Sequence, residues 1–172
     1  MSRHFKGEQN MKFQLVASKP TSSKYEEIYV TEWAWRPICS MLAIANYLDF
    51  ESKGMYIIHP DKFREIDDSM GEGINNDNAC KMLGEKMKLL SSDPAIIESY
   101  GMTVDLIDGE FVFTYPPALC TSAMQHKESK NIINSEVKES QYDSVCIMLR
   151  ATEKDVSEVI DFLMNCGGFL IP

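Results

Sequence analysis

The sequence predicts an α+β fold with about three main helices packed on a small, mostly antiparallel sheet. Apolar residues recur at spacings of three and four in three separate stretches, as on one face of a helix. Around them lie short runs rich in β-branched and aromatic residues, which favour strands. Glycine, proline and capping residues stand at the ends of these stretches and divide the elements from one another.

Length and composition favour one domain. A chain of 172 residues, 44% of them hydrophobic, is long enough to bury a core without help from a metal. Residues 1–10 are charged or small and are expected to form a flexible N-terminus. Residues 11–172 are expected to form a single globular domain, since no internal repeat or low-complexity tract interrupts them.

Two strands and a helix are expected first. Residues 11–17 alternate apolar and polar side chains, and residues 25–31 are a weaker, aromatic and β-branched strand candidate. Pro37 is expected in the first turn of a helix, where a missing N–H costs no hydrogen bond, so the residues before it are expected to be extended. Gly54 marks the end of this helix. Its expected inner face is Ile38, Met41, Leu42, Ala45 and Leu48.

The middle of the chain carries one clear helix. Residues 55–60 are either an edge strand or a cover over the core, and residues 69–78 are a turn-rich loop. A helix follows until Ser91 to Pro94 stop it, and its expected inner stripe is Ala79, Cys80, Leu83, Met87 and Leu90.

The C-terminal half mixes strong and weak signals. Residues 96–104 are read as a short helix, 111–115 and 144–149 as strands, and 124–140 as a loop or a solvated helix. Thr152 with Asp155 predicts the capping box of a third helix. Its expected inner residues are Val156, Val159, Ile160 and Leu163. Residues 165–168, with two glycines, predict a left-handed helix end, and residues 169–171 a terminal strand.

Charge and cysteine usage narrow the partners and the compartment. The net charge of −9 repels phosphate backbones and anionic lipids, so we expect no nucleic-acid or membrane partner. A basic or neutral partner is more natural, although acidic charge also serves plain solubility. The five cysteines are odd in number and widely spaced, which predicts small buried side chains in a reducing cytoplasm. Neither a signal-peptide core nor a run of ~20 apolar residues is present.

No motif predicts catalysis, a metal or a cofactor. The three histidines are isolated from one another, and the acids at 67, 68 and 72 do not fit a calcium-loop pattern. Cys120 and His126 are the one conceivable nucleophile and base, and no surrounding motif supports them. We therefore expect a protein without enzymatic activity.

The candidate ligand site centres on two tryptophans. Trp33 and Trp35 point the same way if their segment is extended, and Arg36 follows at the expected strand-to-helix corner. One interpretation is a wall of the core. The other is a stacking platform with a guanidinium for a carboxylate or phosphate, to which Arg150 adds a second guanidinium.

Two glycines precede the second predicted helix. Gly71 and Gly73 resemble part of a phosphate-binding loop at a helix N-terminus, which attracts anions. Glu72 and Asp77 oppose a phosphate there. The alternative is a tight connection with a capping Asn or Asp.

Three segments together carry a resemblance. They are Trp-x-Trp-Arg-Pro at 33–37, Gly-x-Gly-Ile at 71–74 before an Ala- and Leu-containing helix, and Phe-Leu at 162–163 followed by Gly-Gly-Phe at 167–169. In this order they resemble an uncharacterised family of small bacterial and bacteriophage proteins, in which Leu is usual where Ile74 stands. The resemblance implies a cytoplasmic phage or bacterial protein. By analogy, such proteins blunt host defence by sequestering a nucleotide signal or by binding a defence enzyme.

Two functional hypotheses follow from the sequence. The first is a non-catalytic protein that binds a nucleotide-like ligand and sequesters a host-defence signal, through Trp33, Trp35, Arg36, Gly71, Gly73 and Arg150. The alternative is an inhibitor or adaptor whose acidic surface contacts a basic site on a host protein.

Overall fold

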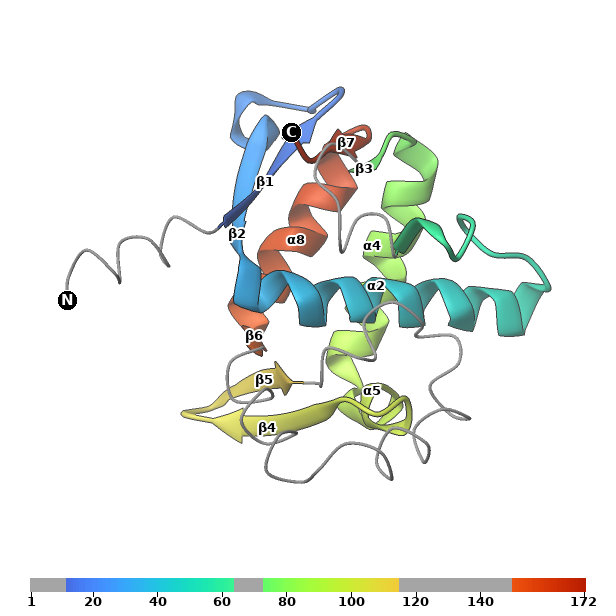
Figure 1. Cartoon of the computed structure of the whole chain (residues 1–172), viewed down its shortest axis with the longest axis vertical. Helices are drawn as coiled ribbons and strands as arrows, with labels where there is room; N and C mark the ends of the chain where they lie inside the picture. Colours follow the sequence, from blue (N-terminus) through green and yellow to red (C-terminus); the bar gives the residue numbers. More distant parts are fainter. Residues whose placement is uncertain (1–11, 64–72, 115–149) are drawn as a thin grey trace.

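The computed structural model describes residues 12–63, 73–114 and 150–172 (Figure 1). These residues include three long helices and two small antiparallel sheets. The protein therefore has the α+β fold that the sequence predicts. The expectations for residues 1–10, 124–140 and 144–149 lie outside the described ranges.

The larger sheet joins the two ends of the chain. Its strand order is β2-β1-β7-β3, and all its pairs are antiparallel. Val16 pairs with Leu170, and Leu170 also pairs with Gly73. The sequence predicts β1, β2 and β7 near their observed bounds. These bounds are β1 (Lys12–Ala17), β2 (Glu27–Thr31), β3 (Gly73–Ile74) and β7 (Phe169–Leu170).

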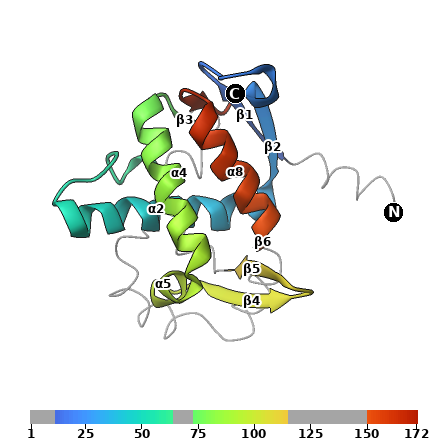
Figure 2. The same cartoon turned by 180° about the vertical axis from the view of Figure 1, so that it is seen from behind.

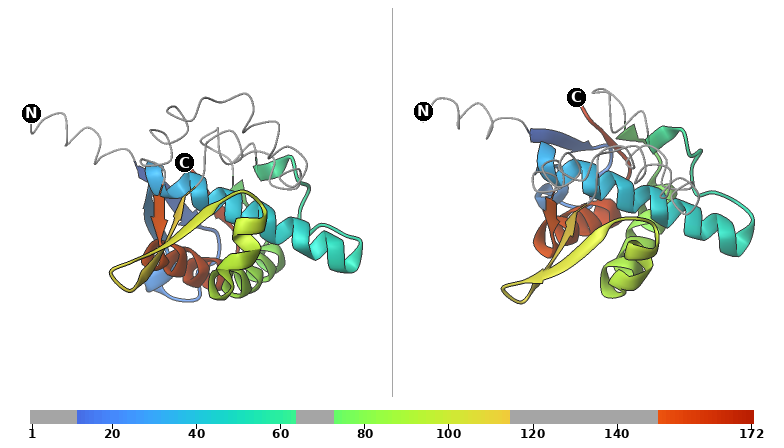
Figure 3. Two further views of the ribbon diagram at one scale, coloured as in Figure 1. Left: turned by 90° about the horizontal axis from the view of Figure 1, so that it is seen from below. Right: turned by 60° about the horizontal axis from the view of Figure 1, so that its bottom comes forward.

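The smaller sheet is a hairpin with a third strand added. Strands β4 (Thr103–Ile107) and β5 (Glu110–Thr114) are joined at Asp108 and Gly109, and β6 (Arg150–Thr152) pairs with β5. Asp108 and Gly109 have φ values of 53° and 80°, which suit the right-handed twist of a two-residue hairpin. Figure 3 shows this hairpin reaching outward from the helices.

One part of the predicted middle region is wrong. The short helix expected over residues 96–104 is α5 (Pro94–Ser99), and the chain becomes strand β4 from Thr103. The β-branched Thr103, Val104 and Ile107, together with the Asp-Gly turn, favour a strand over a longer helix. The strand expected over residues 111–115 is β5.

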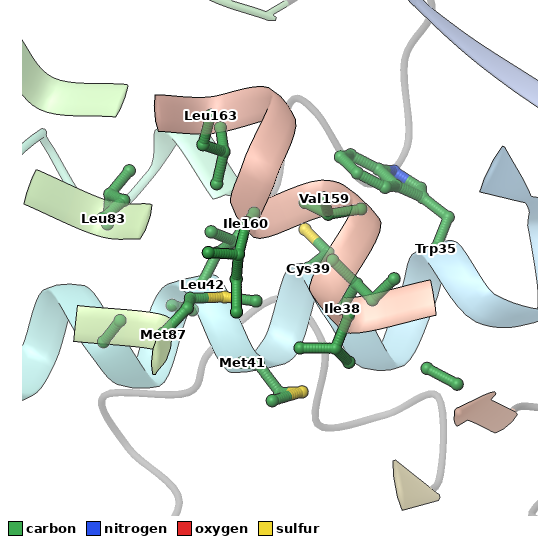
Figure 4. Packing of buried hydrophobic residues seen from close by; sticks show 14 of the residues in the cluster. Trp35, Ile38, Cys39, Met41, Leu42, Leu83, Met87, Val159, Ile160 and Leu163 are labelled. Atoms are coloured by element: carbon green, nitrogen blue, oxygen red, sulfur yellow. The ribbon is translucent and has the colours of Figure 1, made fainter. Parts of the chain in front are cut away.

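The helices form the body of the molecule. Helices α4 (Asp77–Ser92) and α8 (Glu153–Asn165) pack side by side, and α2 (Glu32–Lys53) lies across them (Figures 1 and 2). All three contribute to one cluster of buried apolar side chains (Figure 4). The inner stripes predicted for α4 and α8 are buried.

Helix α2 is buried more completely than its pattern predicts. Every residue from 37 to 46 is buried, although the sequence predicts one inner face only. Asn46 is polar and only 1% exposed. Its side chain accepts the N–H groups of Ile57 and Ile58 at 2.8 and 3.1 Å and donates to the Ile58 carbonyl at 2.9 Å. Residues 55–60 therefore cover the core and form no strand.

The predicted start of α2 is wrong. The helix begins at Glu32, and Thr31 is its N-cap, with the Thr31 hydroxyl oxygen accepting the Ala34 N–H at 3.2 Å. Pro37 lies inside the helix, one turn and a half from its start. A proline there has no N–H to donate to the carbonyl of Trp33, but the capped first turn and the burial of the following residues offset that loss.

Other helix boundaries follow the sequence closely. Gly54, with φ of 77°, ends α2 in the left-handed conformation. Thr152 and Asp155 form the predicted capping box of α8. Gly167 and Gly168 have φ values of 68° and 107° and turn the chain from α8 into β7.

The observed start of α2 predicts the effect of removing its cap. Thr31→Ala removes the acceptor of the Ala34 N–H and should lower the free energy of unfolding by about 1 kcal/mol in urea denaturation. Thr31→Ser keeps the acceptor and should retain most of that stability. Equal stability of the alanine and serine variants would contradict a helix capped at Thr31.

Candidate functional site

Helical geometry separates the two tryptophans. Residues two apart on a helix point about 200° apart, so Trp33 and Trp35 do not share a side as an extended segment would require. Trp35 is fully buried, and its ring lies 5.7 Å from that of Phe13, centroid to centroid. Trp33 is half-buried. In this structure the Trp35 indole belongs to the core and has no face open to a ligand.

Arg36 and Arg150 lie on elements that touch. Arg36 is half-buried on α2, and Arg150 is exposed at the start of β6, which packs against α2. The fold therefore brings two predicted cationic residues to neighbouring elements, with Trp33 close by in the sequence. Three of the residues that the sequence predicts for the ligand site, namely Trp33, Arg36 and Arg150, thus lie on α2 and β6. This region is called the α2–β6 corner.

Gly73 lies elsewhere, in the larger sheet. It is buried in β3, and a Cβ built on it would lie 2.1 Å from the Phe169 carbonyl oxygen. The glycine is therefore required by the close pairing of β3 with β7. Gly71 lies outside the described residues.

A hollow of about 320 Å³ opens beside Gly73. Such a volume is at the small end of ligand-binding clefts. Three segments form it, namely residues 58–62, residues 73–76 and the strand β7, of which only β7 is distant in sequence from the other two. Its lining residues are Ile58, His59, Lys62, Gly73, Ile74, Asn75, Asn76 and Leu170.

The ionisable residues that line the hollow are basic. Among the described residues they are His59 and Lys62, whereas the whole chain has 26 acidic and 17 basic residues. His59 Nδ1 accepts the Asp61 N–H at 3.2 Å, so the neutral ring carries its proton on Nε2. Asp61 lies next to this ring, with Oδ2 at 3.7 Å from Nδ1. Lys62 thus brings a positive charge to the lining of this hollow, on a protein whose net charge is −9.

The N-terminus of α4 adds donors to the same hollow. Asn76 is the N-cap, and its Oδ1 accepts the Ala79 N–H at 2.9 Å. Asn75 Oδ1 accepts the Ser18 hydroxyl at 2.8 Å, which leaves the Asn75 amide nitrogen as a donor group. The first N–H groups of a helix have no partner within that helix and favour negative charge.

Sequence reasoning missed this hollow. It treated His59 as an isolated residue before a proline and did not consider Lys62. No local pattern joins these residues to Asn75, because long-range packing brings them together. The glycine at 73 was the one usable signal, and it marks the edge of the hollow.

A second hollow has different chemistry. It measures about 430 Å³ and lies between α4 and α8. Its lining includes the carboxylates of Glu158 and Asp161 and the ammonium group of Lys88. Its mixed charge does not select an anion. Its lining residues are Lys88, Ser157, Glu158, Ile160, Asp161, Met164 and Asn165.

The C-terminal end of α2 carries an aromatic cluster. The rings of Phe50 and Tyr56 stack at 4.4 Å, and Tyr47 lies 5.9 Å from the ring of Tyr100. The Tyr100 hydroxyl donates to Glu51 Oε1 at 2.7 Å. Burial and this carboxylate raise the pKa of Tyr100 above its usual value. Met55 stands beside the cluster and is 70% exposed.

Neither a metal site nor a membrane-spanning helix is present in the part of the chain that the structure describes. Residues 12–63, 73–114 and 150–172 contain no group of three His, Cys, Asp or Glu side chains able to hold a metal ion. No helix within the same ranges has the length and apolar character needed to span a membrane.

Comparisons of the chain with protein-family models, with curated proteins and with solved structures found no match. The resemblance to small bacterial and bacteriophage proteins thus stays a prediction from the sequence.

Proposed function

We propose that this chain is a non-catalytic binding protein that takes a small, nucleotide-like anion in the hollow between residues 58–62 and the start of α4. The observation that carries the proposal is the lining of that hollow. Its ionisable members among the described residues are His59 and Lys62, on a protein of net charge −9. An ammonium group and hydrogen-bond donors in a concave place suit an anion.

The rest of the lining supports the same ligand class. Ile58, Ile74 and Leu170 provide apolar surface for the uncharged part of a ligand. The lysine ammonium, the histidine Nε2–H and the Asn75 amide provide hydrogen-bond donors for phosphate or carboxylate oxygens. Apolar contact supplies affinity, and the donors select an anion over a neutral molecule.

The biological role that we propose is sequestration of a host-defence signal in the host cytoplasm. It rests on the sequence resemblance to small bacteriophage proteins and on the chemistry of the hollow, because many such signals are small nucleotides. Trp33, Arg36 and Arg150 remain a proposed second contact region on α2 and β6. Gly71, which lies outside the described residues, also remains a proposed contact.

Calorimetry tests the proposed ligand class. The native chain should bind at least one member of a panel of cyclic, linear and ADP-ribose-type nucleotides, more weakly as salt rises. Lys62→Gln should weaken binding roughly tenfold or more, because one charge-assisted hydrogen bond contributes about 1.5–3 kcal/mol. Lys88→Gln is the matched control, since Lys88 lines the other hollow, and should bind normally.

Two outcomes would contradict this proposal. One is the absence of binding by the folded native chain across the whole panel. The other is equal weakening by Lys62→Gln and Lys88→Gln, which would show a diffuse charge effect in place of a site. Arg150→Gln tests the alternative location of the site. If this variant loses binding and Lys62→Gln does not, the ligand binds at the α2–β6 corner.

The aromatic cluster favours a second candidate function, an inhibitor or adaptor that binds a host protein. Phe50, in the last turn of α2, is 37% exposed, and Met55, just beyond the end of this helix, is 70% exposed. This end of α2 reaches past α4 (Figure 1). Exposed aromatic and methionine side chains are typical of binding hot spots. Glu51 lies in the same turn and suits a partner with a basic rim.

A matched pair of substitutions tests the second candidate. Met55→Asp places a charge in the cluster and should abolish stoichiometric capture of a basic host protein from bacterial lysate. Leu89→Asp changes a side chain that is 61% exposed on α4 and should leave capture intact. Capture that survives Met55→Asp, or that both variants lose, would contradict this surface.

A further inference from the structure

Helices α4 and α8 run antiparallel, and several contacts define their alignment. A Cβ built on Gly84 would lie 2.9 Å from Met164 Sδ and 3.4 Å from the Cβ of Leu163. Helix α4 runs from β3 down to α5, whereas α8 runs from β6 up to β7 (Figure 1). As the residue number rises along α4, its partner on α8 therefore falls.

The same alignment places two cysteines opposite each other. One turn before Gly84 on α4 is Cys80, and one turn beyond Leu163 on α8 is Cys166, the C-cap. The next contact supports this pairing, since a Cβ on Gly168 would lie 3.0 Å from the backbone nitrogen of Asn76. The two thiols interact through their side chains, although their positions are 86 residues apart.

The environment makes the two thiols unequal. Both are fully buried, and Cys80 Sγ donates to the Ile74 carbonyl at 3.4 Å. The interaction between the thiols and the burial of Cys80 raise the pKa of Cys80, and the same interaction lowers the pKa of Cys166. Cys166 therefore ionises first and is the better nucleophile, with Cys80 beside it.

We propose that Cys80 and Cys166 form an oxidation-sensitive pair that closes to a disulfide when the protein meets a peroxide. The Cys166 thiolate attacks one peroxide oxygen, the O–O bond breaks, and hydroxide leaves as a sulfenic acid forms. The Cys80 sulfur then attacks the Cys166 sulfur. The S–S bond forms, the Cys80 proton joins the leaving hydroxide, and water departs.

A small oxidant reaches the buried pair when the C-terminal end of α8 opens locally, and helix ends open at lower free energy than helix centres. Cys166 is the C-cap of α8, and opening breaks the hydrogen bonds that the carbonyls of Asn165 and Cys166 accept from the N–H groups of Thr21 and Lys19, at 3.0 and 2.9 Å. The sequence predicts a reducing cytoplasm, in which the resting pair holds two thiols. The pair thus serves as a site that changes only under oxidative stress.

Closure would also alter the proposed ligand hollow. In the disulfide, Cys80 has no S–H to donate to the Ile74 carbonyl, and Ile74 lines that hollow. This consequence depends on the proposed function. The disulfide itself does not, so the experiment below detects the bond directly.

Peptide mapping of the full chain tests the bond. The reduced native protein is treated with excess hydrogen peroxide, alkylated after unfolding and digested with trypsin without reduction. Peptides 65–81 and 155–172 should appear joined, with two hydrogens fewer than their sum, while Cys39 is alkylated. Cys39 is the internal control, because it is equally buried and its Sγ contacts the Phe63 carbonyl.

Variants sharpen the result. Cys39→Ala should leave the link intact, and Cys80→Ala should leave a sulfenic acid on Cys166 that dimedone traps. The proposal is overturned if both cysteines stay alkylatable in the treated native protein, or if they oxidise without linking. It is equally overturned if Cys120 or Cys146 is the partner of Cys166.

Discussion

The rest of the structure depends on the buried middle of one helix. Residues 37 to 46 of α2 have almost no exposed surface, and α4, β6, β2 and β1 pack against this helix. Burial also brings in the polar Asn46, whose amide must be satisfied. It is satisfied by the backbone of Ile57 and Ile58, and this holds the segment after α2 against the core.

That constraint connects the core to the proposed ligand hollow. Ile58, held by Asn46, forms one side of the hollow, and His59 and Lys62 follow it directly. The opposite side depends on the absence of a side chain at Gly73, which lets β3 pair closely with β7. The lining of the hollow, with Lys62 in it, is thus a product of core packing and of the pairing of β3 with β7.

Local sequence patterns predicted the fold well, and long-range packing explains the features that those patterns missed. The capping box at Thr152, the glycines after α8 and the apolar stripes act within a few residues, so they can be read from the chain. The helix start predicted from Pro37 was wrong, because Thr31 caps the helix six residues earlier and burial outweighs one missing hydrogen bond. Because the helix begins at Glu32, Trp33 and Trp35 point about 200° apart and not to one side. The hollow has no local signature, since β7 joins two segments that lie about 100 residues earlier in the chain.

Helix α2 starts before its tryptophans and places Trp35, but not Trp33, in the core. Acrylamide quenching of two single-tryptophan variants tests it most directly. In Trp33→Phe the remaining Trp35 should emit at shorter wavelength and resist quenching, whereas in Trp35→Phe the remaining Trp33 should emit at longer wavelength and be quenched readily. Equal and efficient quenching of both indoles in the folded variants would contradict the account.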